Sequence, residues 1–155
     1  MRLVPSADVF LSFAGRLDRE RWRAAVALLI LVNLAAVGLT WLLTTQGLLS
    51  PGGRDRARVF VQAFTLVPWL AVDWKRFHDR GRPGALALIC PGLYGASRLW
   101  ETPLVAHAPA HGAIEALLSW AQLGVALWLT YALALASGTE GPNVYGRDPR
   151  DGVPT

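Results

Sequence analysis

The chain has 155 residues, of which 53% are hydrophobic and only 17% charged, and it contains seven tryptophans. This composition differs from that of an ordinary soluble domain, and the length suits a single domain. The formal net charge of +4 comes from fourteen arginines and one lysine that cluster beside apolar runs, a placement that indicates membrane orientation and argues against a nucleic-acid surface.

Residues 1–23 are predicted to lie on the cytosolic surface of the membrane. Phe10, Phe13 and Leu17 are spaced three and four residues apart, as on one face of a short surface helix. The segment lacks the continuous apolar stretch of a cleavable signal peptide. Asp18 is predicted to be the N-cap of the helix that follows, because its side chain can accept a hydrogen bond from a free backbone N–H.

Residues 24–45 are uncharged and are predicted to form the first transmembrane helix. At 1.5 Å per residue they reach about 33 Å, which is enough for a hydrocarbon core about 30 Å thick. Asn33, near the middle, is expected to make an interhelical hydrogen bond worth about 0.6–2 kcal/mol. Residues 46–58 contain a Ser-Pro-Gly-Gly turn and three arginines, and we expect them to form a loop.

Two shorter apolar runs predict the second and third transmembrane helices, over residues 58–74 and 84–100. Pro68 is expected to kink the second helix, and Gly81 to cap its extension beyond the membrane in the left-handed conformation. Two short spans that contain proline, here Pro68 and Pro91, could be the broken helices of a transporter. Because the chain shows no repeat of two halves, two kinked helices in a small bundle are the favoured interpretation.

Residues 116–137 are uncharged and predict a fourth span, and residues 138–155 predict a cytosolic tail rich in turns. An inside N-terminus puts five basic residues before the first span, four in the central polar stretch and two in the tail on the inside, against four outside. The positive-inside rule therefore selects cytosolic N- and C-termini, although the three arginines of residues 54–58 oppose this choice. The predicted fold is an all-α, polytopic integral membrane protein with four transmembrane helices in one membrane domain over residues 1–155.

Three polar motifs fall on the predicted cytosolic side, within residues 13–22, 75–84 and 138–149. Their characteristic residues are Phe13, Gly15 and Arg16; then Arg76, His78, Asp79 and Gly81; then Gly138, Gly141, Asn143, Tyr145 and Gly146. In this order they resemble the bacterial inner-membrane family labelled domain of unknown function 805. The chain differs from the family pattern at Lys75, where a second arginine is common, and at residues 83–86, where Ser-Gly-Trp-Trp is usual.

The resemblance runs from about residue 9 to residue 150. It implies a small multi-pass protein of the bacterial inner membrane, and it implies no established reaction. The residues expected to shape the turns of the motifs are Phe13, Gly15, Gly81, Gly84, Gly138, Gly141, Gly146 and Pro149.

The leading functional hypothesis is a non-enzymatic platform on the cytosolic face that binds an anionic lipid or a protein partner. Arginine favours bidentate contacts to phosphate, and a helix would put Asp73, Arg76, Phe77 and Arg80 on one face. The predicted binding residues are Arg16, Arg76, His78, Asp79, Arg80, Asn143 and Tyr145. The simpler interpretation, which we favour for most of these charges, is that they fix topology and pair with Asp73, Asp79 and Glu140.

Catalytic residues are not expected in this chain. His78 and Asp79 are adjacent, so on a helix their side chains point about 100° apart, and no serine or cysteine nucleophile lies in the same stretch. A lipid-modifying enzyme that uses this pair is the third functional hypothesis. The second is a small transporter or exporter component, suggested by polar and proline residues within the spans: Asn33, Gln62, Pro68 and Pro91.

No cofactor, metal site or nucleic-acid partner is expected, and the lipid bilayer is the expected environment. His107 and His111 have the spacing of a helical metal pair, but Pro109 disfavours a helix between them and no third ligand is adjacent. We therefore expect these histidines in a solvated outer loop. The single cysteine, Cys90, cannot form an intrachain disulfide and lies in an apolar run.

Overall fold

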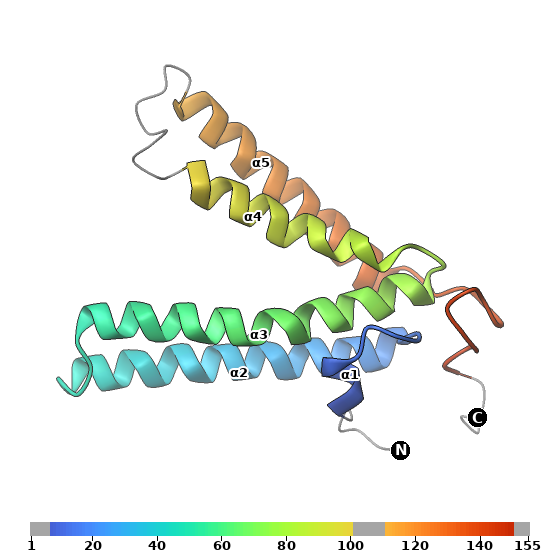
Figure 1. Ribbon diagram of the computed structural model, residues 1–155, viewed down its shortest axis with the longest axis horizontal. Coiled ribbons are helices and arrows are strands. Elements are labelled where there is room, and N and C mark those ends of the chain that lie inside the picture. The colour runs from blue at the N-terminus through green and yellow to red at the C-terminus, as the bar shows by residue number, and fades with distance from the viewer. Residues whose placement is uncertain (1–6, 101–110, 151–155) are drawn as a thin grey trace.

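The computed structural model describes residues 7–100 and 111–150, and Figure 1 shows their arrangement. The elements, in chain order, are α1 (Ala7–Leu11), α2 (Arg19–Thr45), α3 (Pro51–Asp79), the 3-10 helix η1 (Gly84–Leu88), α4 (Ile89–Trp100), α5 (His111–Leu129) and the π-helical turn η2 (Thr130–Leu135). These residues contain no strand beyond one isolated bridge, between Asn143 and Gly146. The predicted all-α class is therefore confirmed for the described part of the chain.

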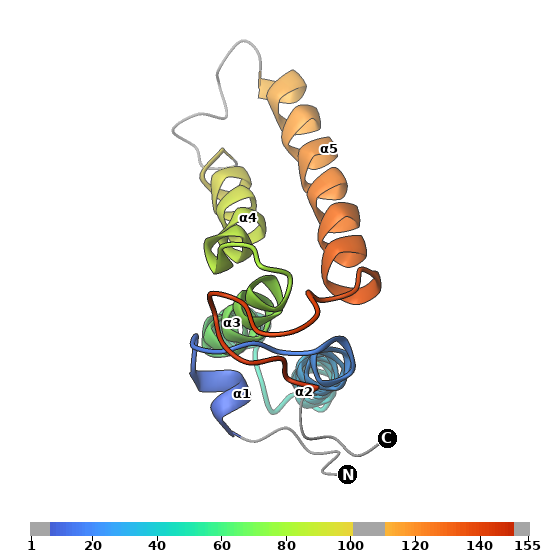
Figure 2. The same cartoon turned by 90° about the vertical axis from the view of Figure 1, so that its right-hand side faces the viewer.

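The helices form two pairs that diverge from a common base (Figure 1). Helices α2 and α3 pack along each other, and α4 packs on α5. The pairs meet where η1 packs on α3 and where η2 packs on α2 and α3. Viewed from the base, α1 and the segment after η2 lie across the ends of α2 and α3, so the three polar motifs of the sequence come together there (Figure 2).

Local sequence signals set the ends of the long helices. Asp18 caps α2 by accepting a hydrogen bond from the backbone N–H of Arg21 at 2.9 Å, as predicted. Ser50 caps α3 in the same way, and Pro51 occupies the first turn. Helix α3 ends at Asp79 with Arg80 at the C-cap, and Gly81 follows with a φ of +66° and donates its N–H to His78 O at 3.0 Å, as in a left-handed cap. The predicted cap at Gly81 is confirmed.

Within residues 7–100 and 111–150, two helical stretches are long and apolar enough to cross a membrane, Arg19–Thr45 and Gly112–Leu135. Only 11% of the most apolar window of each is buried, so neither resembles the core helix of a soluble protein. Large apolar side chains such as Leu31 and Leu34, each 62% exposed, cover the outside of α2. These features indicate association with a membrane.

The buried apolar residues concentrate at the base of the two pairs. The core cluster includes Leu17 from the loop before α2, Val72 and Phe77 from α3, and Leu133 from η2. Gly84 packs directly against the indole ring of Trp74 at this base, so closely that a Cβ at this position would overlap the ring. Further from the base the helices bury few side chains, so the base holds the two pairs together.

Several sequence expectations are wrong at the level of single elements. Residues 51–58 are the first two turns of α3 rather than part of a loop, because Ser50 and Pro51 start a helix that tolerates the glycines after them. The surface helix α1 ends at Leu11 and includes neither Phe13 nor Leu17. Gly15, with a φ of +85°, lies in the loop that replaces it.

Expectations about Asn33, His111 and the end of the fourth span also need correction. Asn33 donates to Leu29 O in its own helix at 2.8 Å rather than to a neighbouring helix, because a helix carbonyl has a second lone pair that a side chain four residues later can use. Helix α3 is continuous through Pro68, and the kink expected there stays a prediction. His111 is the first residue of α5 rather than part of a loop, and His107 and Pro109 lie outside the described residues. The fourth helix ends in η2 at Leu135, before Gly138.

Candidate functional site

The last turn of α3 places Asp79 between two arginines that come from different segments. Asp79 Oδ1 accepts hydrogen bonds from Arg16 Nε at 3.2 Å and from Arg16 Nη2 at 3.0 Å. Asp79 Oδ2 accepts from Arg76 Nη1, one turn earlier on α3. The side chains are 5% exposed for Asp79, 1% for Arg16 and 0% for Arg76, so this is a buried, closed group of three charges. We call Arg16, Arg76 and Asp79 the latch.

Arg16 also binds the segment that follows η2. Its Nη1 donates to Gly141 O and its Nη2 to Thr139 O, both at 2.6 Å. Asp79 holds the same segment through its main chain, because Asp79 O accepts from Thr139 N at 2.8 Å and from Thr139 Oγ1 at 2.9 Å. A Cβ on Gly138 would overlap the Asp79 carboxylate, so only glycine allows this approach. The latch therefore ties the N-terminal loop, α3 and the tail together.

Arginines also satisfy the backbone carbonyls at the end of η2. Arg76 donates to Leu133 O at 2.9 Å and to the carbonyl of Ala136, and Arg23 donates to the carbonyl of residue 134 at 2.8 Å. Arg19 Nη1 lies 3.4 Å from the carbonyl oxygen of residue 135. The last carbonyls of a helix lack intrahelical partners and carry partial negative charge, so cations are favourable there. Nothing in the sequence indicated this use of Arg19 and Arg23, because it depends on where η2 packs.

His78 is not one of the latch residues and joins two other motifs. Its Nδ1 lies 3.1 Å from Gly15 O, and because that oxygen only accepts, Nδ1 carries the proton. The imidazole stacks on the ring of Tyr145 with centroids 3.9 Å apart and an interplanar angle of 7°. Asn143 Nδ2 donates to His78 O at 3.0 Å, and Asn143 Oδ1 accepts from Tyr145 N at 2.8 Å. His78 thus fixes the tail turn against the loop at Gly15.

Burial dominates the ionisation of these groups. It raises the pKa of Asp79, and the hydrogen bond and charge of Arg16 and the charge of Arg76 oppose this effect. Burial lowers the pKa of Arg76, and the charge of Asp79 opposes this. Burial also lowers the pKa of His78, with the Gly15 hydrogen bond acting in the other direction. Burial and the nearby charge of Arg82 lower the pKa of Arg80.

The latch leaves a set of arginines around it with unused donors. The side chains of Arg80 and Arg82 make no hydrogen bond or ion pair with any residue in the described ranges 7–100 and 111–150. Arg19 and Arg23 each bind one carbonyl and retain other N–H groups. Arg19 and Arg80 both lie near enough to Arg76 to affect its pKa, and Arg82 lies near Arg80. We call Arg19, Arg23, Arg80 and Arg82 the arginine rim.

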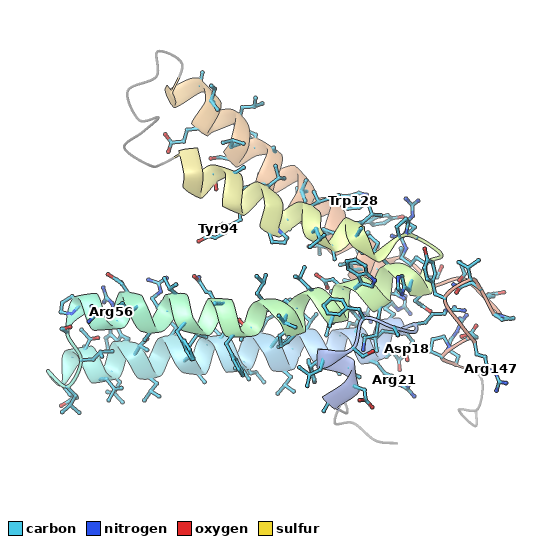
Figure 3. The ribbon with its side chains drawn as sticks, in the orientation of Figure 1. Asp18, Arg21, Arg56, Tyr94, Trp128 and Arg147 are labelled. Atoms are coloured by element: carbon cyan, nitrogen blue, oxygen red, sulfur yellow. The ribbon has the colours of Figure 1, made fainter. Side chains whose placement is uncertain are left out.

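All seven residues predicted to form the platform lie at the base of the helix pairs, and six of them are joined by contacts. Arg16, Arg76 and Asp79 form the latch, His78, Asn143 and Tyr145 form the turn contact, and Arg80 belongs to the rim. Of the acids expected to pair with arginine here, Asp79 does so, whereas Asp73 Oδ1 accepts from Trp22 Nε1 at 2.9 Å. Figure 3 shows Asp18, Arg21 and Arg147 at this same end, and Arg56 at the far end of α2 and α3.

The remaining motif residues have local roles at the base. Phe13 contacts Trp74 edge to face, with ring centroids 5.5 Å apart. Four glycines predicted to shape turns have positive φ: Gly15, Gly81, Gly141 and Gly146. Within the described residues, no group of three or more histidine, cysteine or acidic side chains could hold a metal ion.

A family model described as "Protein of unknown function (DUF805)" matches residues 10–147, which include the latch and the arginine rim. No curated protein and no solved structure gives a significant match to the chain.

Proposed function

Since the chain belongs to the family described as Protein of unknown function (DUF805), we propose a specific role for it within that family. It is a four-span protein of the bacterial inner membrane with both termini in the cytosol, and it acts without catalysis. Its latch is a scaffold, and its arginine rim binds the phosphates of anionic lipid headgroups on the cytosolic side.

Helix lengths support four spans. Helix α2 has 27 residues and the stretch Gly112–Leu135 has 24, or about 40 and 36 Å at 1.5 Å per residue. Helix α3 has 29 residues, or about 43 Å, so it can cross the membrane and extend beyond it. The 3-10 helix η1 and helix α4 have 5 and 12 residues and reach about 28 Å, close to the hydrocarbon thickness of about 30 Å. The concentration of arginines at the base supports a cytosolic base.

The observation that carries the proposal is the difference between the latch and the rim. The latch arginines donate hydrogen bonds to Asp79 and to backbone carbonyls, so few of their N–H groups are available to a ligand. Arg80 and Arg82 sit at the same base with their guanidinium groups unpaired among the described residues. Guanidinium groups suit phosphate oxygens, and each basic residue near an anionic membrane surface contributes about 1 kcal/mol.

The contacts of Asp79 also favour a non-enzymatic role. Both carboxylate oxygens of Asp79 are bonded to arginines. A general base needs its acceptor atom within reach of a substrate proton. The latch carboxylate, with its arginine partners and 5% exposure, lacks that access.

Lipid retention by the purified protein tests the proposal. We expect Arg80→Gln/Arg82→Gln to weaken binding of phosphatidylglycerol by about thirty-fold, because two arginines contribute about 2 kcal/mol together. The matched control is Arg21→Gln/Arg147→Gln, which removes two exposed charges from the same end of the molecule. Native mass spectrometry of lipid titrations measures both. Equal lipid binding by the two double variants would contradict the proposal.

A further inference from the structure

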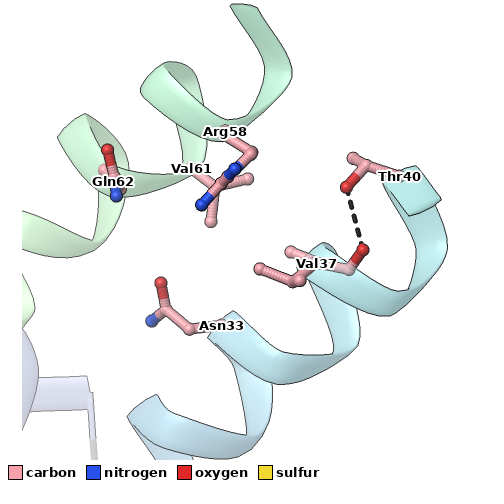
Figure 4. Close-up of a pocket in the computed structure, with 7 residues that line it drawn as sticks. Asn33, Val37, Thr40, Arg58, Val61 and Gln62 are labelled. Atoms are coloured by element: carbon pink, nitrogen blue, oxygen red, sulfur yellow. Dashed lines mark hydrogen bonds between the residues drawn. The ribbon is translucent and has the colours of Figure 1, made fainter. Parts of the chain in front are cut away.

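A second polar site lies between α2 and α3, far from the latch. It is a pocket of about 60 Å³, several times the roughly 10–15 Å³ that one water molecule requires (Figure 4). Its polar lining is Asn33 and Thr40 from α2 and Arg58 and Gln62 from α3, and the rest is aliphatic. None of the acidic residues in the described part of the chain lines it.

The pocket has more hydrogen-bond donors than the chain itself uses. Asn33 Nδ2 donates one N–H to Leu29 O at 2.8 Å. Thr40 donates to Val37 O at 3.0 Å, the bond that Figure 4 shows. The side chains of Arg58 and Gln62 make no hydrogen bond or ion pair with residues of the described segments. An arginine has five N–H donors and a glutamine amide has two, so most of the donors at this pocket are free.

The position of the pocket makes an unpaired arginine unusual. Thr40 and Asn33 lie five and twelve residues before the end of α2 at Thr45, or about 8 and 18 Å along the helix. If α2 and α3 span the membrane as proposed, the pocket runs from the outer boundary of the hydrocarbon towards its middle. Ionisable residues within membrane spans are costly, and they pair with an opposite charge or line a functional pathway. Because no described carboxylate lines the pocket, an anionic ligand is the natural source of the opposite charge.

We propose that this pocket binds a phosphate-type anion through Arg58, with Gln62 and Asn33 as additional donors. Guanidinium groups bind phosphate oxygens bidentately, and amide N–H groups can bond a remaining oxygen. Arg58 and Gln62 are exposed on the helix pair, so the ligand enters from the side. The anion is a free phosphate or the headgroup phosphate of an outer-leaflet lipid. The inference needs α2 and α3 to span the membrane, and it does not need the arginine rim to bind lipid.

Thermal unfolding of the detergent-solubilised chain tests the pocket in two arms. One arm adds inorganic phosphate against sodium chloride of equal ionic strength, and the other adds phosphatidylglycerol against phosphatidylcholine. Both use the Arg80→Gln/Arg82→Gln background, which weakens lipid binding at the rim and so reduces its contribution. A ligand that binds only the folded state raises the melting temperature with its concentration.

We expect Arg58→Gln to weaken the binding measured in this way by about ten-fold or more, because it removes charge-assisted hydrogen bonds. Arg56→Gln is the control, since Arg56 is exposed on the same helix and does not line the pocket. Stabilisation by phosphate alone identifies a free anion, and stabilisation by phosphatidylglycerol identifies a lipid headgroup. If neither ligand stabilises the protein, or if R58Q and R56Q bind alike, the inference is wrong. Should R58Q fail to fold, Gln62→Leu replaces it, with a smaller loss expected.

Discussion

Replacing Asp79 by alanine removes the only anion of the latch and leaves two buried guanidinium groups. Breaking a buried ion pair by removing one partner costs about 3–5 kcal/mol. Asp79 accepts three guanidinium N–H groups, two from Arg16 and one from Arg76. Both arginines keep their bonds to backbone carbonyls, those of Gly141 and Thr139 for Arg16 among them. Because those bonds remain, we expect the lower part of the range, about 3 kcal/mol of unfolding free energy.

The assay is reversible unfolding in mixed micelles, followed by tryptophan fluorescence. Asp55→Ala is the matched control, because Asp55 is 67% exposed and its ion pair with Arg54 measures 3.9 Å. Exposed pairs of this kind contribute about 0–1 kcal/mol. If D79A and D55A lower the free energy of unfolding equally, the reasoning about the latch is refuted.

Two further substitutions test the contacts around the latch. Gly138→Ala should lower the free energy of unfolding by about 1–3 kcal/mol, because its Cβ would overlap the Asp79 carboxylate. The control is Gly124→Ala on α5, where a Cβ meets no atom within 4 Å, and it should not destabilise the protein in the same unfolding assay. The lowered pKa of His78 means that the unfolded state binds the proton more readily, so stability should fall as the pH drops below about 6.5. His78→Gln should weaken this dependence in unfolding titrations at pH 7.5 and 5.5, and a slope that does not change would contradict the assignment.

Parts of the fold with strong local signals could be predicted from the sequence. The caps at Asp18 and Gly81 depend on residue type and near neighbours, and both are confirmed. The start of α3 could not be predicted so easily, because the glycines after Pro51 disfavour a helix and the Ser50 cap outweighs them. The π-helical turn of η2 has no local signal, since its carbonyls find their partners on α2 and α3.

The composition of the site could be predicted better than its internal bonding. The three motifs were expected to meet, and the structure joins them through Arg16, Asp79 and Asn143. The sequence could not indicate that backbone carbonyls accept hydrogen bonds from Arg16 and Arg76, because every residue has such a carbonyl. Since these donors are already used, the proposed ligand contacts lie at Arg80 and its neighbours and not at the latch.

The central claim is that the latch and rim face the cytosol while the far ends of both helix pairs face outward. Single cysteines at Arg82, Arg147, Arg56 and Ala113, each in a Cys90→Ser background, test it with a thiol reagent that does not cross membranes. The account predicts that cysteines at 56 and 113 react in cells with a permeable outer membrane, whereas those at 82 and 147 react only in inverted vesicles. Cysteines at 82 and 147 that react from opposite sides of the membrane would contradict it, because the motifs could not then form one latch.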